Sequence, residues 1–597
     1  MSVAELSKSE MRVPELLVRR RDGRRPYKRP LANLWILLLI VFVASLALRL
    51  AAWKYWGTGA IESEGAEYAR LAQNLRNGVG YVGLVTPGAQ LNFNPLFPLF
   101  IAGISAVTSD YELAGRIVAL IMGALLPIPV FGIGRRLFSR RVAFIAAGLV
   151  MIHPLLLHLS FTVFSEGPYI TLLLTAAYCV TRALDEPSVG NWLLVGGAFG
   201  LAWLVRAEAT AALCIALMFA LLVTPRPWGA RLRRALAALA IFLAIIAPQV
   251  LYVYKNSGQF RLEVKSQMFQ YTGKRILVAE RHPGVDYVSP GGHHEVPSPE
   301  FNVESGQSWQ EKWAFYGIDS NLNGMGFSLR PHSEIVRSTQ VSMKDVFSVI
   351  AKGFRWNAPA LFRTLSADWV GAPFLPALAL LGVVRRPWRK RAGKTKMFIL
   401  LLSCAPLTAT FFALWSEQRY YFIFIPFLCI WAAKGLVEIG VWLSESLQAT
   451  AWPGLARPAR FLVPATIATI MLVGAVQPVA KLYVFADSAP PTRSDKLIGM
   501  WIAEQQSGSF KIMDLSIPLA FHAGSQFTYF PYAAGEQTLA YADRAGVDYI
   551  ILRPEQSFTK YYQDWLLHGI PDARAERLLP PDIPGGKDLI VYRWHRR

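Results

Sequence analysis

Long apolar runs recur along most of the chain and are separated by short clusters of Lys and Arg. A helix needs about 20 mainly apolar residues to cross the hydrocarbon core of a bilayer. The pattern predicts about eleven membrane-spanning helices, of which the shorter ones are extended by flanking residues or tilted against their neighbours. The chain is therefore expected to be a mainly α-helical, polytopic membrane protein. The predicted spans are residues 34–52, 117–133, 142–159, 168–180, 192–205, 209–223, 235–252, 374–384, 397–414, 422–437 and 461–479.

The basic clusters predict which loops face the cytoplasm, because Lys and Arg concentrate on that side. A cytoplasmic N-terminus with about eleven spans places every cluster there, whereas counting the apolar segment 95–107 as a crossing would invert the cluster 135–141. We therefore predict an interfacial or re-entrant helix at 95–107. The same parity predicts outer regions at 53–116, at 255–368 and after about residue 482. The basic clusters are residues 19–29, 135–141, 226–234 and 385–396.

The pattern changes after residue 490, where short apolar strands alternate with amphipathic helices. Helices are predicted at 495–505 and 536–545, and strands at 510–515, 548–552 and 589–594. This alternation is typical of a small α/β domain, which the parity of the spans places outside the membrane. The predicted divisions are a basic cytoplasmic tail at 1–30, a transmembrane domain at 31–482 with outer loops 53–116 and 255–368, and the α/β domain at 490–597.

Composition agrees with lipid as the main solvent. The 597 residues are 53% hydrophobic and 17% charged, whereas a soluble domain carries about 25% charged residues. The net charge of +21 is spread over small clusters, which argues against one nucleic-acid-binding face. The four cysteines lie in apolar runs without a CxxC pattern, so no disulfide framework or zinc site is expected. His293 and His294 lack the HExxH spacing of a zinc protease.

Acidic residues stand at two places on the predicted outer side. Glu62, Glu64 and Glu67 begin an amphipathic helix that would hold them near the membrane surface, where a carboxylate could take a proton from an acceptor hydroxyl. Glu166 stands at the outer end of a span, and acids held against the membrane are costly and are candidates for function. A solvated helix start and an anchor in interfacial water are the structural alternatives.

Basic residues occupy two further outer positions. Arg206 lies with Glu208 in a turn between two short spans, and Arg419 with Tyr420 opens a later span. An Arg at this depth can bind phosphate through paired hydrogen bonds. Arg and Tyr are also ordinary anchors at the membrane interface, so both interpretations stay open.

Short motifs follow one another in a fixed order along the first 440 residues. They are Glu64, Tyr68 and Gly78 in the first outer loop, Asn94-Pro95-Leu96-Phe97-Pro98, the inner turn Arg135-Arg136-Leu137-Phe138, Pro154, Glu166 before a span, Arg206 after a Gly-Leu-Ala span, and Arg419-Tyr420. In this order they resemble the GT-C class of membrane glycosyltransferases. The resemblance is to the branch with the protein O-mannosyltransferases and the lipid A aminoarabinose transferases, glycosyltransferase family 39. That family usually has Asp followed by a second acid where this chain has Glu64 and Gly65. Glu62 is therefore kept in reserve.

The resemblance implies transfer of a sugar from a polyprenyl-phosphate carrier to a hydroxyl of a protein, lipid or glycan, with inversion. The bacterial inner membrane is the expected location, because the sequence shows no ER-retention signal. It implies Glu64 as the general base and Glu166 as the residue that positions sugar, acceptor or a divalent ion. Substrate would be bound by Tyr68, Asn94, Arg206, Arg419 and Tyr420, the two Arg stabilising the departing phosphate. The alternatives are a lipid-linked sugar flippase or other secondary transporter, in which inverted repeats are common, and a non-catalytic scaffold.

Overall fold

The computed structural model describes most of the predicted membrane helices and the C-terminal region. It describes residues 31–56, 60–84, 88–223, 227–258, 260–262, 374–384, 393–412, 418–449, 493–506, 508–530, 535–556, 560–581 and 589–596, with short pieces within 342–359 and 453–467. His293, His294, most of the predicted loop 255–368 and most of the predicted span 461–479 lie outside these residues.

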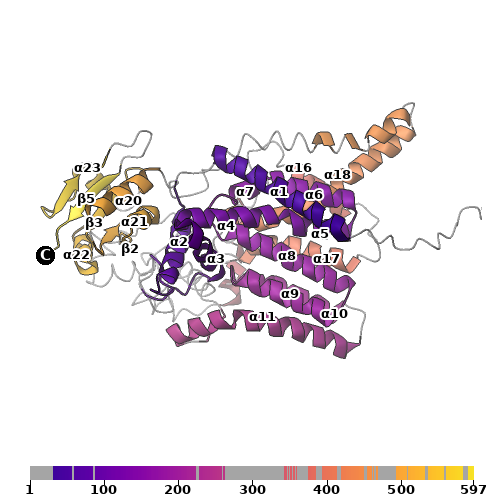
Figure 1. Cartoon of the computed structure of the whole chain (residues 1–597), viewed down its shortest axis with the longest axis horizontal. Coiled ribbons are helices and arrows are strands. Elements are labelled where there is room, and N and C mark those ends of the chain that lie inside the picture. The colour runs from indigo at the N-terminus through magenta and orange to yellow at the C-terminus, as the bar shows by residue number, and fades with distance from the viewer. Residues whose placement is uncertain are drawn as a thin grey trace, which may run out of the picture.

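The apolar runs form a bundle of helices lying side by side (Figure 1). Most of the predicted spans within the described residues coincide with a helix. The helices of the bundle are α1 (Leu31–Trp56), α4 (Tyr111–Leu125), α5 (Pro127–Leu137), α6 (Arg140–Ile152), α7 (Pro154–His158), α8 (Glu166–Asp185), α9 (Val189–Trp203), α10 (Ala209–Leu222), α11 (Trp228–Ser257), α16 (Phe374–Val384), α17 (Gly393–Phe412) and α18 (Ile425–Gln448), with the 3-10 helix η4 (Gln418–Phe424) before α18.

Proline explains where the helices depart from the predicted spans. The run 142–159 is divided between α6 and α7, since His153 before Pro154 adopts an extended conformation with ψ 121°, as a residue preceding proline prefers. Pro127 likewise stands at the boundary between α4 and α5.

Four stretches of the described residues are long and apolar enough to cross a membrane: Trp35–Tyr55, Tyr111–Leu137, Trp228–Ser257 and Tyr421–Gln448. Other apolar helices are shorter, among them α9, α10 and α16. The count of about eleven spans therefore stays a prediction. Along α1, large apolar side chains such as Trp35 and Leu39 are exposed, which suits contact with lipid and not with water.

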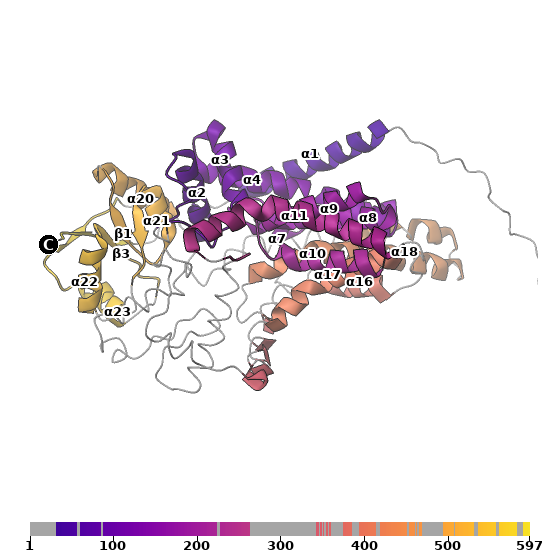
Figure 2. The same cartoon turned by 90° about the horizontal axis from the view of Figure 1, so that it is seen from below.

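Two helices lie between the bundle and the C-terminal region in both views (Figures 1 and 2). The helix α2 (Ser63–Arg76) is the predicted amphipathic helix, and after its cap Gly78 takes the left-handed φ of +74° that favours glycine. The helix α3 (Leu96–Thr108) is present at the segment predicted to be interfacial, and it packs against α2 and α4. Its position relative to the membrane surface stays a prediction.

The C-terminal residues form a five-stranded sheet of order β2-β1-β3-β5-β4 with helices beside it. The strand β1 is parallel to β2 and β3, whereas β5 is antiparallel to β3 and β4. All the helices and strands predicted in this region are present, and α21, β2, α23 and β4 are additional. The elements are α20 (Arg493–Gln505), β1 (Lys511–Met513), α21 (Ile517–His522), β2 (Gln526–Thr528), α22 (Gly535–Ala545), β3 (Tyr549–Leu552), α23 (Lys560–His568), β4 (Ala575–Leu578) and β5 (Ile590–Trp594).

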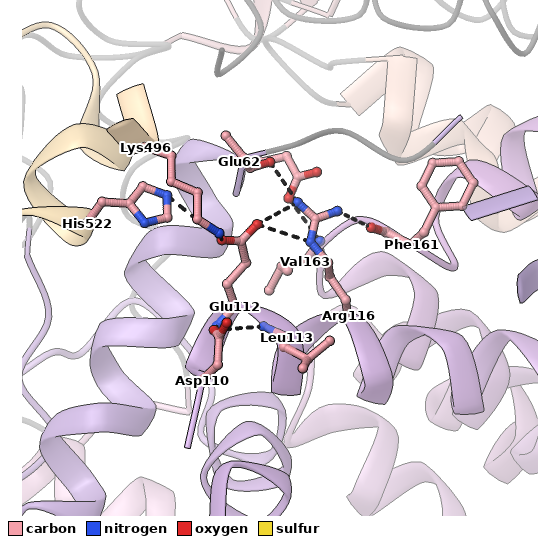
Figure 3. Close-up of polar contacts among 10 residues, drawn as sticks. Glu62, Asp110, Glu112, Leu113, Arg116, Phe161, Val163, Lys496 and His522 are labelled. Atoms are coloured by element: carbon pink, nitrogen blue, oxygen red, sulfur yellow. Dashed lines mark hydrogen bonds and ion pairs between the residues drawn. The ribbon is translucent and has the colours of Figure 1, made fainter. Parts of the chain in front are cut away.

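The C-terminal domain contacts α2 and α4 through α20 and α21 (Figure 3). Lys496 Nζ lies 3.0 Å from Glu112 Oε2, and His522 Nε2 lies 3.9 Å from the same oxygen. Arg70 Nη2 donates to the carbonyl oxygen of Phe521 at 3.5 Å. Burial lowers the pKa of His522 to about 4, although the Glu112 carboxylate opposes this shift. The imidazole is therefore neutral at the junction near pH 7.

Acidification should weaken the C-terminal domain and its junction through His522. The pKa of His522 is lowered in the folded protein, so the unfolded chain takes up a proton more readily than the folded one. The free energy of unfolding is therefore unaffected by this residue above about pH 6.5. It falls by up to about 1.4 kcal/mol per pH unit as the pH decreases toward 4. His522→Gln should flatten this dependence. Hydrogen exchange of the β1 and β3 amides at pH 7.5 and pH 5 measures it, and an equal loss of protection in both proteins would contradict the prediction.

Candidate functional site

Glu64 and Tyr68 lie on one face of α2, one helical turn apart. The Tyr68 hydroxyl donates to Glu64 Oε1 at 3.4 Å, a long contact, and Glu64 is only partly buried. The ring of Tyr68 is buried edge-on against Phe93 and Phe97, with both centroid distances 5.0 Å. Burial, and then the Glu64 carboxylate, raise the pKa of Tyr68. The phenol therefore stays protonated and serves as a hydrogen-bond donor beside a carboxylate that solvent or substrate can reach.

Glu166 and Arg206 form a buried ion pair where α8 begins. Arg206 Nη1 donates to Glu166 Oε1 at 2.7 Å and to Ser165 Oγ at 3.3 Å, while Nη2 donates to Glu208 Oε1 at 2.8 Å. The side chains of Glu166 and Arg206 are 0% and 8% exposed, whereas that of Glu208 is 51% exposed. An acid in the first turn of α8 also suits the positive end of the helix dipole.

The two pairs are neighbours. The pKa of Tyr68 is influenced by Ser165 and by the charges of Arg206 and Glu166, so these groups lie near its hydroxyl, and Arg206 Nη1 itself donates to Ser165 Oγ. The structure thus brings together Glu64, Tyr68, Glu166 and Arg206, which the sequence predicted as site residues from separate motifs. The arrangement places a partly buried carboxylate close to a guanidinium, which is the minimum needed to accept a proton and stabilise an anion at one place.

Asn94 connects the loop before α3 to the end of α9, which closely precedes Arg206. Its side-chain amide donates to the carbonyl oxygen of Trp203, and Leu96 N donates to that of Leu204 at 3.0 Å. The structure thus gives Asn94 a structural contact, and its predicted contact with substrate stays a prediction.

Arg419 and Tyr420 lie in η4, which packs against α8, α17 and α18. The side chains of Arg419 and Tyr420 lie outside the described residues, so their predicted contacts with substrate are not tested.

Glu67 is a structural residue that the sequence did not single out from its two neighbouring acids. It is 1% exposed, and it accepts hydrogen bonds from Leu84 N at 2.6 Å and from Gln90 Nε2 at 2.8 Å. These bonds hold the chain between α2 and α3 against the helix. Helical periodicity gave no signal for it, since Gly65 to Ala69 are all buried and consecutive residues do not share one face of a helix.

Arg116 is the centre of a second buried cluster (Figure 3). Its Nη1 donates to the carbonyl oxygen of Phe161 and its Nη2 to that of Ala60, both at 2.7 Å, and Nη2 also donates to Glu112 Oε1 at 2.9 Å. Sequence reasoning missed this role because backbone acceptors leave no mark in a sequence. The cluster ties the segment before α2 to the segment before α8.

Glu62 belongs to this second cluster and makes a different kind of contact from Glu64. Its Oε2 accepts a hydrogen bond from Val163 N at 3.0 Å, and burial raises the pKa of its carboxyl group, an effect that Arg116 opposes. The Glu62 carboxylate is therefore buried and occupied by a backbone donor, whereas the Glu64 carboxylate is only partly buried. The geometry favours Glu64 as the candidate base.

Gly65 explains why this chain lacks the second acid of the family pattern. A Cβ at Gly65 would lie 2.9 Å from both the Cβ and the carbonyl oxygen of Val163, and one at Gly115 would lie 2.7 Å from Val163 Cγ1. The Val163 side chain therefore fills the space between α2 and α4. Only glycine at position 65 permits this approach.

Gly65→Asp should prevent normal folding even though it restores the acidic pair of the family. Overpacking costs about 1–3 kcal/mol, and a buried charge adds several more. Gly190→Asp is the matched control, since a Cβ there meets nothing within 4 Å and the position lies in the first turn of α9. Thermal unfolding of the two variants in detergent checks the prediction, and equal midpoints would contradict it.

A metal site is not evident in the described part of the chain, where no group of three or more His, Cys, Asp or Glu side chains is arranged to hold an ion. Glu166 instead forms an ion pair with the Arg206 guanidinium. The divalent ion that the sequence allows stays a prediction.

The fold is that of the GT-C class of membrane glycosyltransferases, which confirms the resemblance predicted from the sequence. Residues 92–252 match the model of the dolichyl-phosphate-mannose-protein mannosyltransferase family. No curated protein sequence gives a significant match. Together with the long apolar helices, this fold identifies the chain as an integral membrane protein.

Two solved structures show the likeness. The oligosaccharyltransferase AglB from Archaeoglobus fulgidus, in complex with an inhibitory peptide and a dolichol-phosphate, is 13% identical with a TM-score of 0.55, over 88% of this chain and 70% of that chain. ArnT from Cupriavidus metallidurans, bound to undecaprenyl phosphate, is 14% identical with a TM-score of 0.51, over 94% of this chain and 97% of that chain. At such identities the likeness is one of fold.

Proposed function

We propose that this protein is an inverting glycosyltransferase that moves a sugar from a polyprenyl-phosphate carrier to an acceptor hydroxyl. The observation that carries the proposal is the meeting of Glu64 and Tyr68 with Glu166 and Arg206 within a GT-C fold. The two similar structures support the choice of donor, since one holds a dolichol-phosphate and the other undecaprenyl phosphate.

In the proposed reaction Glu64 takes the proton of the acceptor hydroxyl as its oxygen attacks the anomeric carbon of the sugar. The bond from that carbon to the phosphate oxygen breaks on the opposite face, so the configuration inverts. The electron pair leaves with the polyprenyl phosphate. Tyr68 holds Glu64 in place through its hydroxyl, and Glu166 positions the sugar or the acceptor.

Arg206 stabilises the charge on the departing phosphate, with Arg419 as the second cation. The ion pairs of Arg206 indicate how a phosphate would enter. Because Glu208 is half exposed while Glu166 is buried, Glu208 is the partner that an incoming phosphate would replace. Arg206 would then keep its bond to Glu166 and bind the donor through Nη2.

The proposed site faces the periplasm or exterior of a bacterial inner membrane. The C-terminal domain, residues 490–597, would stand on that same face. Asn94 and Tyr420 are proposed to line the substrate path. The acceptor hydroxyl belongs to a protein, a lipid or a glycan.

Turnover in proteoliposomes tests this function. A panel of labelled polyprenyl-phosphate sugars is offered with candidate acceptors, and release of free polyprenyl phosphate together with labelled acceptor is expected for one donor. If labelled donor moves between leaflets without release of the phosphate, the protein is a flippase instead. If neither occurs with any donor, the enzyme proposal fails.

A further inference from the structure

Lys496, a partly exposed residue of the C-terminal domain, is one of its contacts with the bundle (Figure 3). Lys496 in α20 is 34% exposed, and its Nζ lies 3.0 Å from Glu112 Oε2. The Glu112 side chain itself is 7% exposed. A charge on one domain thus meets a nearly buried charge on the other, at a place where solvent weakens the pair only in part.

Glu112 connects Lys496 to the interior of the bundle, because its other carboxylate oxygen binds the buried Arg116. Glu112 Oε1 accepts from Arg116 Nε at 3.2 Å and from Nη2 at 2.9 Å. Asp110 caps α4 by accepting from Glu112 N at 2.8 Å, which fixes the start of the helix. The Glu112 carboxylate is therefore shared between a cation of the C-terminal domain and a buried cation of the bundle.

Arg116 in turn holds the two segments that lead to the proposed catalytic acids. Its bonds to the carbonyl oxygens of Ala60 and Phe161 are both 2.7 Å long. Beyond these bonds, Glu62 Oε2 accepts from Val163 N at 3.0 Å. Glu64 follows Glu62, and Glu166 follows Val163, within three residues. The contacts of Arg116 and Glu62 therefore hold together the two segments that carry Glu64 and Glu166.

We propose that the C-terminal domain is a positioning element of the active site, acting from Lys496 through Glu112 and Arg116 on the segments before Glu64 and Glu166. This rests on the proposed function, in which these two acids act on one substrate. Lys496 touches neither acid and is a positioning residue. Catalytic groups must be held within about 0.5 Å of their productive geometry, so loosening either segment should slow transfer without weakening donor binding.

Lys496→Gln tests the proposal, with Lys496→Arg as the conservative variant. Coupling of this kind corresponds to a fall in kcat of about fivefold, with an unchanged KM for the donor, and Arg should restore most of the loss. Glu576→Gln is the matched control. Glu576 lies on β4, at the edge of the sheet opposite β2, and the substitution removes its half-exposed ion pair with His595.

Hydrogen exchange of residues 60–66 and 160–166 provides a readout that does not depend on turnover. Both segments should exchange faster in Lys496→Gln and should keep wild-type rates in Lys496→Arg and Glu576→Gln. Unchanged rates in Lys496→Gln overturn the coupling, and so does an equal effect of Glu576→Gln. Faster exchange with an unchanged kcat overturns the role in catalysis. A wild-type protein that transfers no sugar refutes the proposed function, while the exchange rates still decide the coupling.

Discussion

Replacing Glu64 by Gln should lower kcat for sugar transfer by at least about a hundredfold, the usual contribution of a general base. The amide keeps the size of the side chain and can still accept the hydrogen bond from the Tyr68 hydroxyl. It cannot take a proton from the acceptor. The loss should therefore fall on kcat, with the protein still folded in the membrane and the KM for the donor little changed. Single-turnover transfer in proteoliposomes measures it.

Glu62→Gln is the control, because the two acids stand close together in the sequence and differ in their contacts. Burial already disfavours the charge of Glu62 and raises its pKa, and the amide oxygen of Gln can still accept from Val163 N. Transfer should stay within about tenfold of wild type, since only a hydrogen bond is altered. If Glu62→Gln abolishes transfer and Glu64→Gln does not, the assignment of the base is wrong.

Much of the fold followed from local pattern. The apolar run 374–384 coincides with α16, and the alternation after residue 490 predicted α20, β1 and β3. Two of the elements missed there, α21 and β4, lack such a pattern. In α21, the sequence Ile517–His522 is short and begins with Ile-Pro, and β4 has exposed residues at its centre. Their structure depends on packing against the sheet, which a single segment does not record.

The candidate site was predictable to the extent that its members share a helix. Glu64 and Tyr68 meet because of their spacing in α2. Glu166 and Arg206 are separated by 40 positions, so the sequence could place them on one membrane face but could not pair them. The role of Arg116 was hidden for another reason, because its partners include backbone carbonyl oxygens of distant segments.

The same pairing makes Arg206 a position where a substitution should cost much stability. In Arg206→Met the buried Glu166 carboxylate loses its ion-pair partner, and breaking a buried pair in this way costs about 3–5 kcal/mol. The thermal midpoint in detergent should fall, and transfer should fall with it. Glu208→Gln is the comparison, because its half-exposed pair with Arg206 is worth about 1 kcal/mol or less.

A double variant separates the two roles of Arg206. In Arg206→Met with Glu166→Gln no buried carboxylate is left uncompensated, so most of the lost stability should return. Transfer should not return, since the phosphate then lacks its cation, and the single variant Glu166→Gln measures how much of the loss comes from Glu166 itself. Stability is read from thermal unfolding and transfer from release of polyprenyl phosphate. If the double variant regains transfer, Arg206 serves only to neutralise Glu166.

In Glu208→Gln the donor should bind more tightly, because phosphate no longer competes with a carboxylate for Arg206 Nη2. The KM for the donor should fall, and an unchanged KM would contradict the proposed replacement of Glu208 by phosphate.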